Sequence, residues 1–193
     1  MGNTVGTSHP KDARPVTTEA KSRDGVESSH HQTPAPLRRN IAEYITGFVD
    51  GEGCFTVTFN VREKAKLGLE LRLSFSVSQN KERSQILYLM QKYFGCGYIR
   101  PTYRDKTLKY EVRDHNDLML KIIPHFERYP LLSAKQKDFK LFKEICLMID
   151  RKEHLDRNGF MRIIELAYQM NGSGKRKRSK DELIKLLRGD DIV

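Results

Sequence analysis

The residues best suited to chemistry in this chain stand together at positions 44–53, in the string Tyr-Ile-Thr-Gly-Phe-Val-Asp-Gly-Glu-Gly. There an apolar helical stretch stops at an acid, Glu52, that lies between two glycines. The last carbonyl groups of a helix have no partner within it, and glycine lets the chain turn away at little steric cost. A carboxylate beside such carbonyls forms an oxygen site of the kind that Mg²⁺ prefers. An ordinary helix end followed by a solvated acid would give the same short pattern.

The composition predicts a polyanionic partner. The 193 residues include 35 Lys and Arg against 25 Asp and Glu, which gives a formal net charge of +10. No stretch approaches the ~20 apolar residues that a membrane span requires, and no secretory segment begins the chain. We therefore expect an intracellular protein without a membrane partner or a small-molecule substrate. The three cysteines and six histidines are scattered, which favours neither a disulfide framework nor a zinc cage.

Composition also divides the chain. Residues 1–37 are rich in Ser, Thr, Pro, Gly and His and contain almost no large apolar residues, so we expect a disordered N-terminal tail. The four basic residues of this tail balance its four acids, so the whole positive excess falls on residues 38–193. A transit peptide is the alternative interpretation, although the acids argue against it. One domain is expected over 38–171, and a basic segment with a short C-terminal helix over 172–193.

Apolar side chains alternate in two runs after the first helix, at 55–61 and 69–78. Each run places apolar residues on one face and polar residues on the other, which is typical of half-buried strands. The segment 66–68 marks the loop between them. A second strand pair is expected over 97–104 and 107–114. The residues expected to face inward are Phe55, Val57, Phe59, Val61, Leu69, Leu71, Leu73, Phe75 and Val77.

Helical spacing and breaker residues predict the remaining elements. Pro124 is expected to kink or restart one helix, because proline cannot continue the hydrogen-bond ladder. Ser133 is interpreted as an N-cap, and Ser179 with Glu182 as a capping box for the last helix. The expected helices cover residues 38–53, 80–94, 116–128, 133–152, 159–170 and a short stretch after 179.

The string over 45–53 resembles the signature helix of the LAGLIDADG homing endonucleases, and the likeness extends over residues 38–152. One such string is present, as in the single-motif subgroup that acts as homodimers; two-motif members need a longer chain. The resemblance implies an α+β fold of the order αββαββα, with a four-stranded antiparallel saddle-shaped sheet and packed helices. It further implies a site-specific, intron-encoded double-strand DNA endonuclease, which hydrolyses phosphodiester bonds at a long, partly palindromic target.

Gly47 and Gly51 lie four residues apart and thus on one helical face, where missing side chains allow a second helix to approach. Two copies packed there across a twofold axis would bring two Glu52 carboxylates close together. We therefore expect a homodimer with both glycines at its interface. The alternative is that the glycine face packs against the core of its own protomer.

The resemblance also implies the roles of individual residues. Glu52 and the carbonyl of Gly51 would bind Mg²⁺, and Asp50 is interpreted as a structural acid. Many members of the family have Asp where this chain has Glu52, a difference that keeps the charge but moves the metal. The residues implied in catalysis, through water orientation and compensation of phosphate charge, are Glu52, Gln79, Arg83 and Lys135. Lys137 is the alternative counterpart of Lys135.

The polar outer face of the sheet is implied to lie along the DNA major groove, which admits β-ribbons. A sheet face wetted by solvent would explain the alternation equally well, but not the abundance of Arg, Lys, Ser, Thr and Asn on it. The basic run 175–178 is interpreted as a sequence-independent phosphate contact. The candidate DNA-binding residues are Thr58, Asn60, Arg62, Glu70, Arg72, Ser74, Ser76, Arg100, Arg104, Lys109 and Arg113.

Two other functions compete with a DNA endonuclease. A non-cleaving binder on the same scaffold, either an RNA maturase or a transcriptional regulator, would have no need of the four catalytic residues. A generic RNA-binding protein lacks support, because the sequence shows no aromatic stacking platform of the RRM type. The family context places the protein in an organelle, chloroplast or mitochondrion, or in a bacterial cytoplasm.

Overall fold

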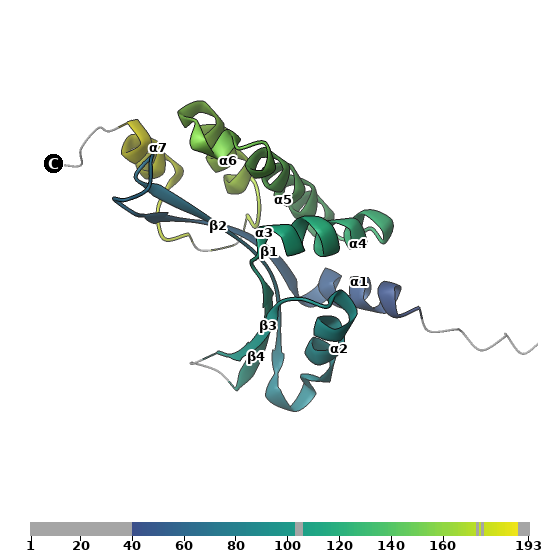
Figure 1. Cartoon of the computed structure of the whole chain (residues 1–193). Coiled ribbons are helices and arrows are strands. Elements are labelled where there is room, and N and C mark those ends of the chain that lie inside the picture. The colour runs from purple at the N-terminus through teal and green to yellow at the C-terminus, as the bar shows by residue number, and fades with distance from the viewer. Residues whose placement is uncertain (1–39, 103–105, 173, 175, 189–193) are drawn as a thin grey trace, which may run out of the picture. The chain divides into compact units, whose positions relative to one another are not determined.

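The computed structural model describes residues 40–102, 106–172, 174 and 176–188. The order αββαββα that the sequence predicts is confirmed there (Figure 1). The tail expected over residues 1–37 lies outside the described residues. The elements are α1 (Ile41–Glu52), β1 (Gly53–Val61), β2 (Leu69–Asn80), the 3₁₀ turn η1 (Lys81–Arg83), α2 (Gln85–Phe94), β3 (Tyr98–Pro101), β4 (Thr107–Val112), α3 (His115–Asp117), the π-helical turn η2 (Leu118–Ile122), α4 (Ile123–Arg128), α5 (Lys135–Asp150), the 3₁₀ turn η3 (Glu153–Leu155), α6 (Arg157–Tyr168) and α7 (Lys180–Arg188).

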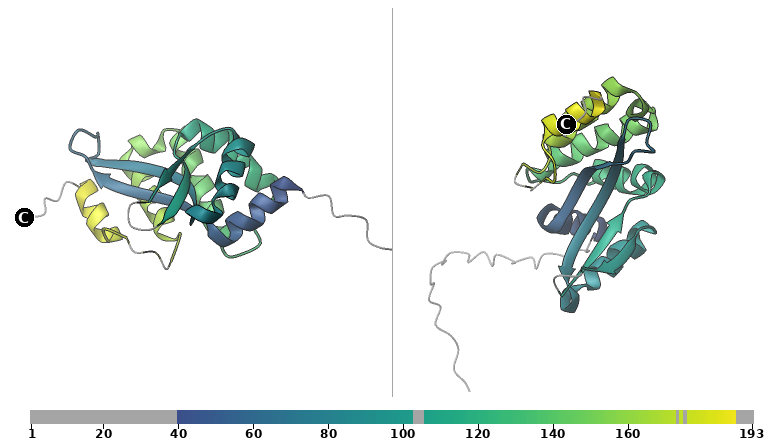
Figure 2. Two further views of the ribbon diagram at one scale, coloured as in Figure 1. Left: turned by 90° about the horizontal axis from the view of Figure 1, so that it is seen from below. Right: turned by 90° about the vertical axis from the view of Figure 1, so that its left-hand side faces the viewer.

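The four strands of the described residues form one antiparallel sheet in the order β1-β2-β4-β3. In the β1–β2 hairpin Gly53 pairs with Val77 and Val61 pairs with Leu69, while Phe75 on β2 also pairs with Val112 on β4. Helices α1, α2, α4 and α5 cover one face of this sheet (Figure 2). The side chains that the strands bury against these helices are Phe55, Val57, Leu73, Phe75, Val77, Tyr110 and Val112.

The structure corrects three details of the predicted elements. Val61, expected to face inward, is 46% exposed, because it ends an edge strand at the hairpin loop. The N-cap position of α5 is Ala134, one residue after the predicted Ser133, although the Ser133 hydroxyl accepts a hydrogen bond from the Lys135 N–H at 3.1 Å, as a capping side chain does. The helix predicted from residue 159 begins at Arg157, because Asp156 caps it with its carboxylate.

Pro124, predicted to kink or restart a helix, lies where the helical geometry changes from π to α. It stands in the first turn of α4, where its missing N–H costs nothing, and the π-helical turn η2 precedes it. The backbone stays right-handed helical at Ile122 and Ile123, and the Ile123 N–H donates to the Leu118 carbonyl, so η2 passes into α4 without a break. None of the helices in the described ranges is long and apolar enough to cross a membrane.

The C-terminal segment packs against the tip of the β1–β2 hairpin (Figure 2). Leu183 and Leu187 of α7 are buried with Leu69 of β2 and with Phe160 and Ile164 of α6. The capping box predicted for α7 is present: the Ser179 N–H donates to Glu182 at 2.7 Å, and the Glu182 N–H donates to the Ser179 hydroxyl at 3.1 Å.

Candidate active site and nucleic-acid interface

Helix α1 leads directly into strand β1, with Glu52 as the last helical residue. The Gly53 N–H still donates to the carbonyl of Val49, and the backbone of Gly53 is already extended. A Cβ atom at position 53 would lie 2.5 Å from Cγ1 of Val49, so glycine is the residue that this direct junction permits. Glu52 is therefore held, exposed, at the point where a helix becomes a strand.

Lys135 lies at the same helix end. Its ammonium group donates to the carbonyl oxygen of Val49 at 2.8 Å and to that of Gly51 at 3.3 Å. Burial lowers the pKa of Lys135, against the opposing effect of nearby acids that include Asp50 and Glu52. Lys137, the alternative counterpart, lies two residues further along α5 and is exposed. The structure thus brings Lys135 to the predicted metal ligands.

Asp50 explains how the turn before α5 is held in place. Its carboxylate accepts hydrogen bonds from the backbone N–H groups of Leu132 and Ser133, both at 3.0 Å, and from the Ser133 hydroxyl. Burial alone would raise the pKa of Asp50, but these hydrogen bonds lower it overall. Because Lys135 follows this turn directly, Asp50 fixes the position from which the lysine reaches α1.

The donor atoms at the end of α1 suit a hard divalent cation. The Glu52 carboxylate and the Gly51 carbonyl are both oxygen donors, which Mg²⁺ and Ca²⁺ prefer. Within the part of the chain that the structure describes, no group of three or more His, Cys, Asp or Glu side chains could hold a metal ion. The described part of one protomer therefore offers an incomplete donor set, which a second carboxylate would extend.

Gln79 and Arg83 lie beyond the start of β1. Since Gly53 pairs with Val77, strand β2 continues past the pair and carries Gln79 alongside the end of α1. The Gln79 side-chain oxygen accepts from the N–H of Asn80 at 2.8 Å. Arg83 is exposed in η1. Among the described residues, neither side chain shares a hydrogen bond or ion pair with Glu52.

The glycine face of α1 is open. A Cβ atom built at Gly47 or at Gly51 would meet nothing within 4 Å. The buried residues of the helix, which include Ile45, Thr46 and Val49, lie on the other side. The alternative that this face packs against the core of its own protomer therefore does not hold for the described residues.

A polar network fastens the buried side of α1 to the neighbouring helices. His125 of α4 is hydrogen bonded through Nε2 to the Thr46 hydroxyl at 3.0 Å and through Nδ1 to the Tyr93 hydroxyl at 3.2 Å. The imidazole is 6% exposed, and burial lowers the pKa of His125 to about 4. This network joins the helix that ends in Glu52 to both α4 and α2.

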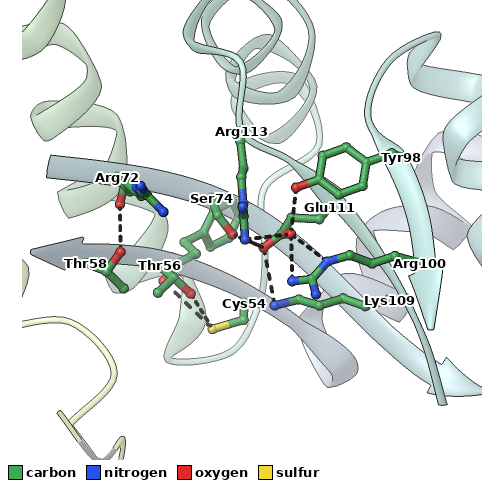
Figure 3. Close-up of polar contacts among 11 residues, drawn as sticks. Cys54, Thr56, Thr58, Arg72, Ser74, Tyr98, Arg100, Lys109, Glu111 and Arg113 are labelled. Atoms are coloured by element: carbon green, nitrogen blue, oxygen red, sulfur yellow. Dashed lines mark hydrogen bonds and ion pairs between the residues drawn. The ribbon is translucent and has the colours of Figure 1, made fainter. Parts of the chain in front are cut away.

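The outer face of the sheet carries two clusters of ion pairs. At the tip of the hairpin, Glu70 pairs with Arg62 at 2.6 Å and with Arg72 at 2.8 Å. Toward the centre, the carboxylate of Glu111 on β4 collects donors from three strands and from the residue after β4 (Figure 3). The side chains around it are Ser74, Tyr98, Arg100, Lys109 and Arg113.

The structure places most of the predicted DNA-binding residues on this outer face, with two exceptions. Ser76 is only 3% exposed, because it pairs directly with Glu111 under the ion cluster, so the prediction that it is available to a ligand is wrong for this conformation. Arg104 lies outside the described residues. Glu111 was missed as an organising residue, although its place between Lys109 and Arg113 on one face of the strand was a usable signal.

The outer face and the C-terminal segment together form a groove of about 720 Å³. One wall is the sheet, from Thr56 to Arg113, and the other includes Arg176, Lys177 and Arg178. Arg176 anchors this second wall: it donates to the carbonyl oxygens of Ala167 and Met170 and lies 4.4 Å from the ring centre of Tyr168. This anchoring role could not be predicted from the sequence, because a basic run does not show which of its members is packed.

Asn171 secures the start of the same segment. Its side-chain amide donates to the Phe55 carbonyl on the free edge of β1 at 2.8 Å, and its backbone N–H donates to Asp138 at 3.1 Å. Edge strands expose unpaired carbonyls, and covering them blocks pairing with other chains. The segment therefore both protects the sheet edge and shapes the groove.

Comparison with known proteins identifies relatives of this arrangement. A family model described as LAGLIDADG endonuclease matches residues 45–146. The chain is 34% identical over 131 residues to the probable intron-encoded endonuclease 2 of Neurospora crassa, an alignment that covers 68% of this chain and 27% of the fungal protein. The chain spans about a quarter of the length of the fungal relatives that it matches first.

Solved structures share the fold over most of the chain. The homing endonuclease I-TnaI is 34% identical, with a TM-score of 0.68 over 78% of this chain and 97% of its own. I-SmaMI, solved bound to an uncleaved DNA target in the presence of calcium ions, is 29% identical, with a TM-score of 0.67 over 76% of this chain and 48% of its own.

Proposed function

The chain belongs to the LAGLIDADG endonuclease family, and we propose that it is a site-specific double-strand DNA endonuclease of the intron-homing type. The observation that carries the proposal is the meeting of Glu52, the Gly51 carbonyl and the Lys135 ammonium group at the end of α1. A protein that only binds nucleic acid would not need a lysine held against potential metal ligands. The intron-encoded relatives support a mobile intron as the coding context, in an organelle or a bacterium.

The proposed active form is a homodimer joined along α1. The open face at Gly47 and Gly51 supports close contact with the same helix of a second copy. Each copy would then contribute one Glu52 to a shared centre. A twofold protein favours two matched half-sites, so the target is proposed to be partly palindromic.

The proposed cofactor is Mg²⁺, and the oxygen donors at Glu52 and Gly51 fit it. The calcium present in the I-SmaMI structure supports a divalent cation in general. When bound, such an ion would supply positive charge to the phosphate and lower the pKa of water nearby.

The reaction proposed for the chain is hydrolysis of a phosphodiester. A water oxygen forms a bond to phosphorus, and the bond from phosphorus to the 3′ oxygen breaks, with the departing oxygen taking up a proton. Lys135 would offset charge that develops on the phosphate, and Arg83, which is exposed beside the sheet, would do the same from the other side. Gln79, alongside the end of α1, would orient the attacking water.

DNA is proposed to lie in the groove between the outer sheet face and the C-terminal segment. The exposed Arg72 and Lys177, which line this groove, would supply charge to phosphates on either side, and the exposed Arg62 would do so from the hairpin tip. Thr58, Asn60 and Ser74 lie between them with hydroxyl or amide groups that suit base edges. Glu70 would hold Arg62 and Arg72 in place rather than contact DNA directly.

The proposal is tested by cleavage of a duplex that carries the host sequence with the intron removed, with Mg²⁺ and with or without a chelator. Wild-type protein is expected to cut both strands in the presence of Mg²⁺ and to stop when the ion is chelated. Glu52→Gln is expected to lower cleavage by about 10²–10³-fold, because it removes the charged ligand. Binding of Glu52→Gln in a gel shift should survive.

The control variant is Glu165→Gln, which makes the same change at an exposed position on α6, away from α1. Normal cleavage by this variant would show that the effect at position 52 is local. Tight binding by the wild-type protein without metal-dependent cutting would contradict the endonuclease proposal and favour a binder on the same scaffold.

A further inference from the structure

We propose that Glu111 is a specificity-determining residue, which holds Arg100 so that the free end of its guanidinium group reads a guanine in the DNA major groove. This inference rests on the proposed function, because it takes the outer sheet face as the DNA-reading surface. It assigns a role to an acidic residue on a surface that is otherwise suited to attract phosphates.

The surroundings of Glu111 are those of an organising residue. Its side chain is 2% exposed although it stands on the outer face of the sheet, because the donors around it cover both carboxylate oxygens. Ser74 donates to Oε1 at 3.1 Å, and Tyr98 donates to Oε2 at 2.9 Å (Figure 3). Arg113 reaches both oxygens, at 3.2 Å and 3.0 Å. Such a carboxylate cannot itself contact DNA.

Arg100 is held more rigidly than the other cations of the cluster. It donates to Oε2 through two nitrogen atoms, Nε at 3.2 Å and Nη2 at 3.1 Å, which fixes the plane of the guanidinium group. Lys109 makes a single contact, at 3.4 Å, and an ammonium group has no plane to fix. Arg113 contacts both carboxylate oxygens through one nitrogen atom, Nη2, so two nitrogen atoms do not fix its plane as they do in Arg100. Arg100 is therefore the cation of this cluster whose orientation is set before any ligand arrives.

The contacts of Arg100 leave one edge of the guanidinium group free. Nε and one hydrogen of Nη2 are engaged, so Nη1 and the second hydrogen of Nη2 form a pair of parallel donors. This pair matches the O6 and N7 acceptors of guanine, the base that arginine recognises most often in the major groove. The Arg100 side chain is 42% exposed, so the free edge can reach a ligand.

The charge balance of the cluster still favours DNA. Three cations, Arg100, Lys109 and Arg113, surround one carboxylate, so the group keeps a net charge of +2. Removal of the Glu111 charge should therefore strengthen attraction to phosphates while it frees Arg100 to move. If only base reading is lost, preference for guanine falls while affinity for unrelated DNA stays equal or rises. If the fold is lost, both fall.

The experiment is selection from a library of duplexes with a randomised core, followed by sequencing of the bound fraction. Wild-type protein first defines the preferred half-site, and Arg100→Ala identifies the position that Arg100 reads, where guanine enrichment should disappear. Glu111→Gln is expected to reduce guanine enrichment at that same position by about tenfold, the value of a weakened bidentate contact. Affinity of Glu111→Gln for a duplex of unrelated sequence should stay equal or rise.

The matched control is Glu70→Gln, which removes an acid of the second ion cluster and should leave the Arg100 position unchanged. Tyr98→Phe provides a milder change: it removes one donor to Glu111, keeps the carboxylate, and should weaken the same preference by a smaller factor. Tyr98→Phe decides the matter if Glu111→Gln does not fold.

Full guanine enrichment in Glu111→Gln, or in Tyr98→Phe if that variant must decide, would overturn the role of Glu111. A preference for another base at the position defined by Arg100→Ala would overturn the assignment of guanine. Failure of the wild-type protein to enrich any sequence would instead refute the proposed function itself.

Discussion

Lys135 donates a hydrogen bond to the carbonyl oxygen of Gly51 at 3.3 Å, and so joins the start of helix α5 to the end of helix α1. The two residues are 84 positions apart in the chain. A lysine in this place can stabilise the carbonyl groups at a helix C-terminus, and it can also meet a substrate phosphate that arrives there.

The first prediction concerns the charge of Lys135. Lys135→Met keeps much of the aliphatic stem but removes the ammonium group, so cleavage is expected to fall by about 10²–10³-fold, the usual cost of one electrostatic group in a reaction centre. DNA affinity in a gel shift should change by much less. Lys137→Met is the control, since it removes an exposed charge from the same helix and should keep cleavage within about twofold. A reversed pattern would identify Lys137 as the catalytic lysine.

The second prediction separates folding from dimer formation at Gly47. Gly47→Leu should stabilise the isolated protomer by about 1 kcal/mol, because leucine is a better helix former than glycine and its Cβ meets no neighbour. The same side chain would obstruct the approach of a second helix. Sedimentation is therefore expected to show loss of the dimer, and cleavage should be lost with it.

Lys140→Leu is the control for Gly47→Leu, because it places the same side chain on an exposed position of α5. That variant should remain dimeric. A dimeric and active Gly47→Leu protein would mean that the copies meet through another surface.

The third prediction concerns pH and His125. The pKa of this histidine is about 4 in the fold, against an ordinary value of 6.5, because burial disfavours the imidazolium form. Below pH 6.5 the unfolded chain therefore takes up a proton that the folded chain does not. The stabilising contribution is present above pH 6.5 and is lost as the pH falls toward 4, by a total of about 3 kcal/mol.

Urea unfolding at several pH values measures this effect. The free energy of unfolding of the wild-type protein should fall more steeply between pH 6.5 and pH 4 than that of His125→Gln, which has no imidazole to titrate. The two proteins should have parallel curves above pH 7. Equal slopes in the acidic range would show that His125 is protonated without cost to the fold.

Sequence patterns predicted the order of elements because strands and helices have different apolar periods, and the alternation over 55–59 and 69–77 is borne out by burial. Val61 is an exception, since periodicity does not reveal that a residue ends an edge strand. The N-cap of α5 was predicted one residue early, at Ser133. The hydrogen bond from the Ser133 hydroxyl to Asp50 could not be predicted, because Asp50 is distant in sequence and close only in the fold.

The candidate site was predictable in part for a similar reason. The motif around Glu52 is local, so its residues could be read directly from the chain. The proximity of Lys135 to Gly51 depends on tertiary packing, and only the family resemblance pointed to it. Glu111 was visible as an outward acid, but its burial under Arg100 and Arg113 depends on side chains from another strand and from the residue after β4.

Because no loop separates α1 from β1, Glu52 has a fixed position relative to the strand that is proposed to contact the bases. Glu52 and the first residue of the reading strand are adjacent in the chain, and the close approach of Gly53 to Val49 leaves no slack between them. Under the proposed function, the spacing between recognised bases and the cut phosphodiester is therefore built into the backbone. Evolution could retarget such an enzyme through outer-face side chains alone, and each new site would be cut at the same offset as the old one.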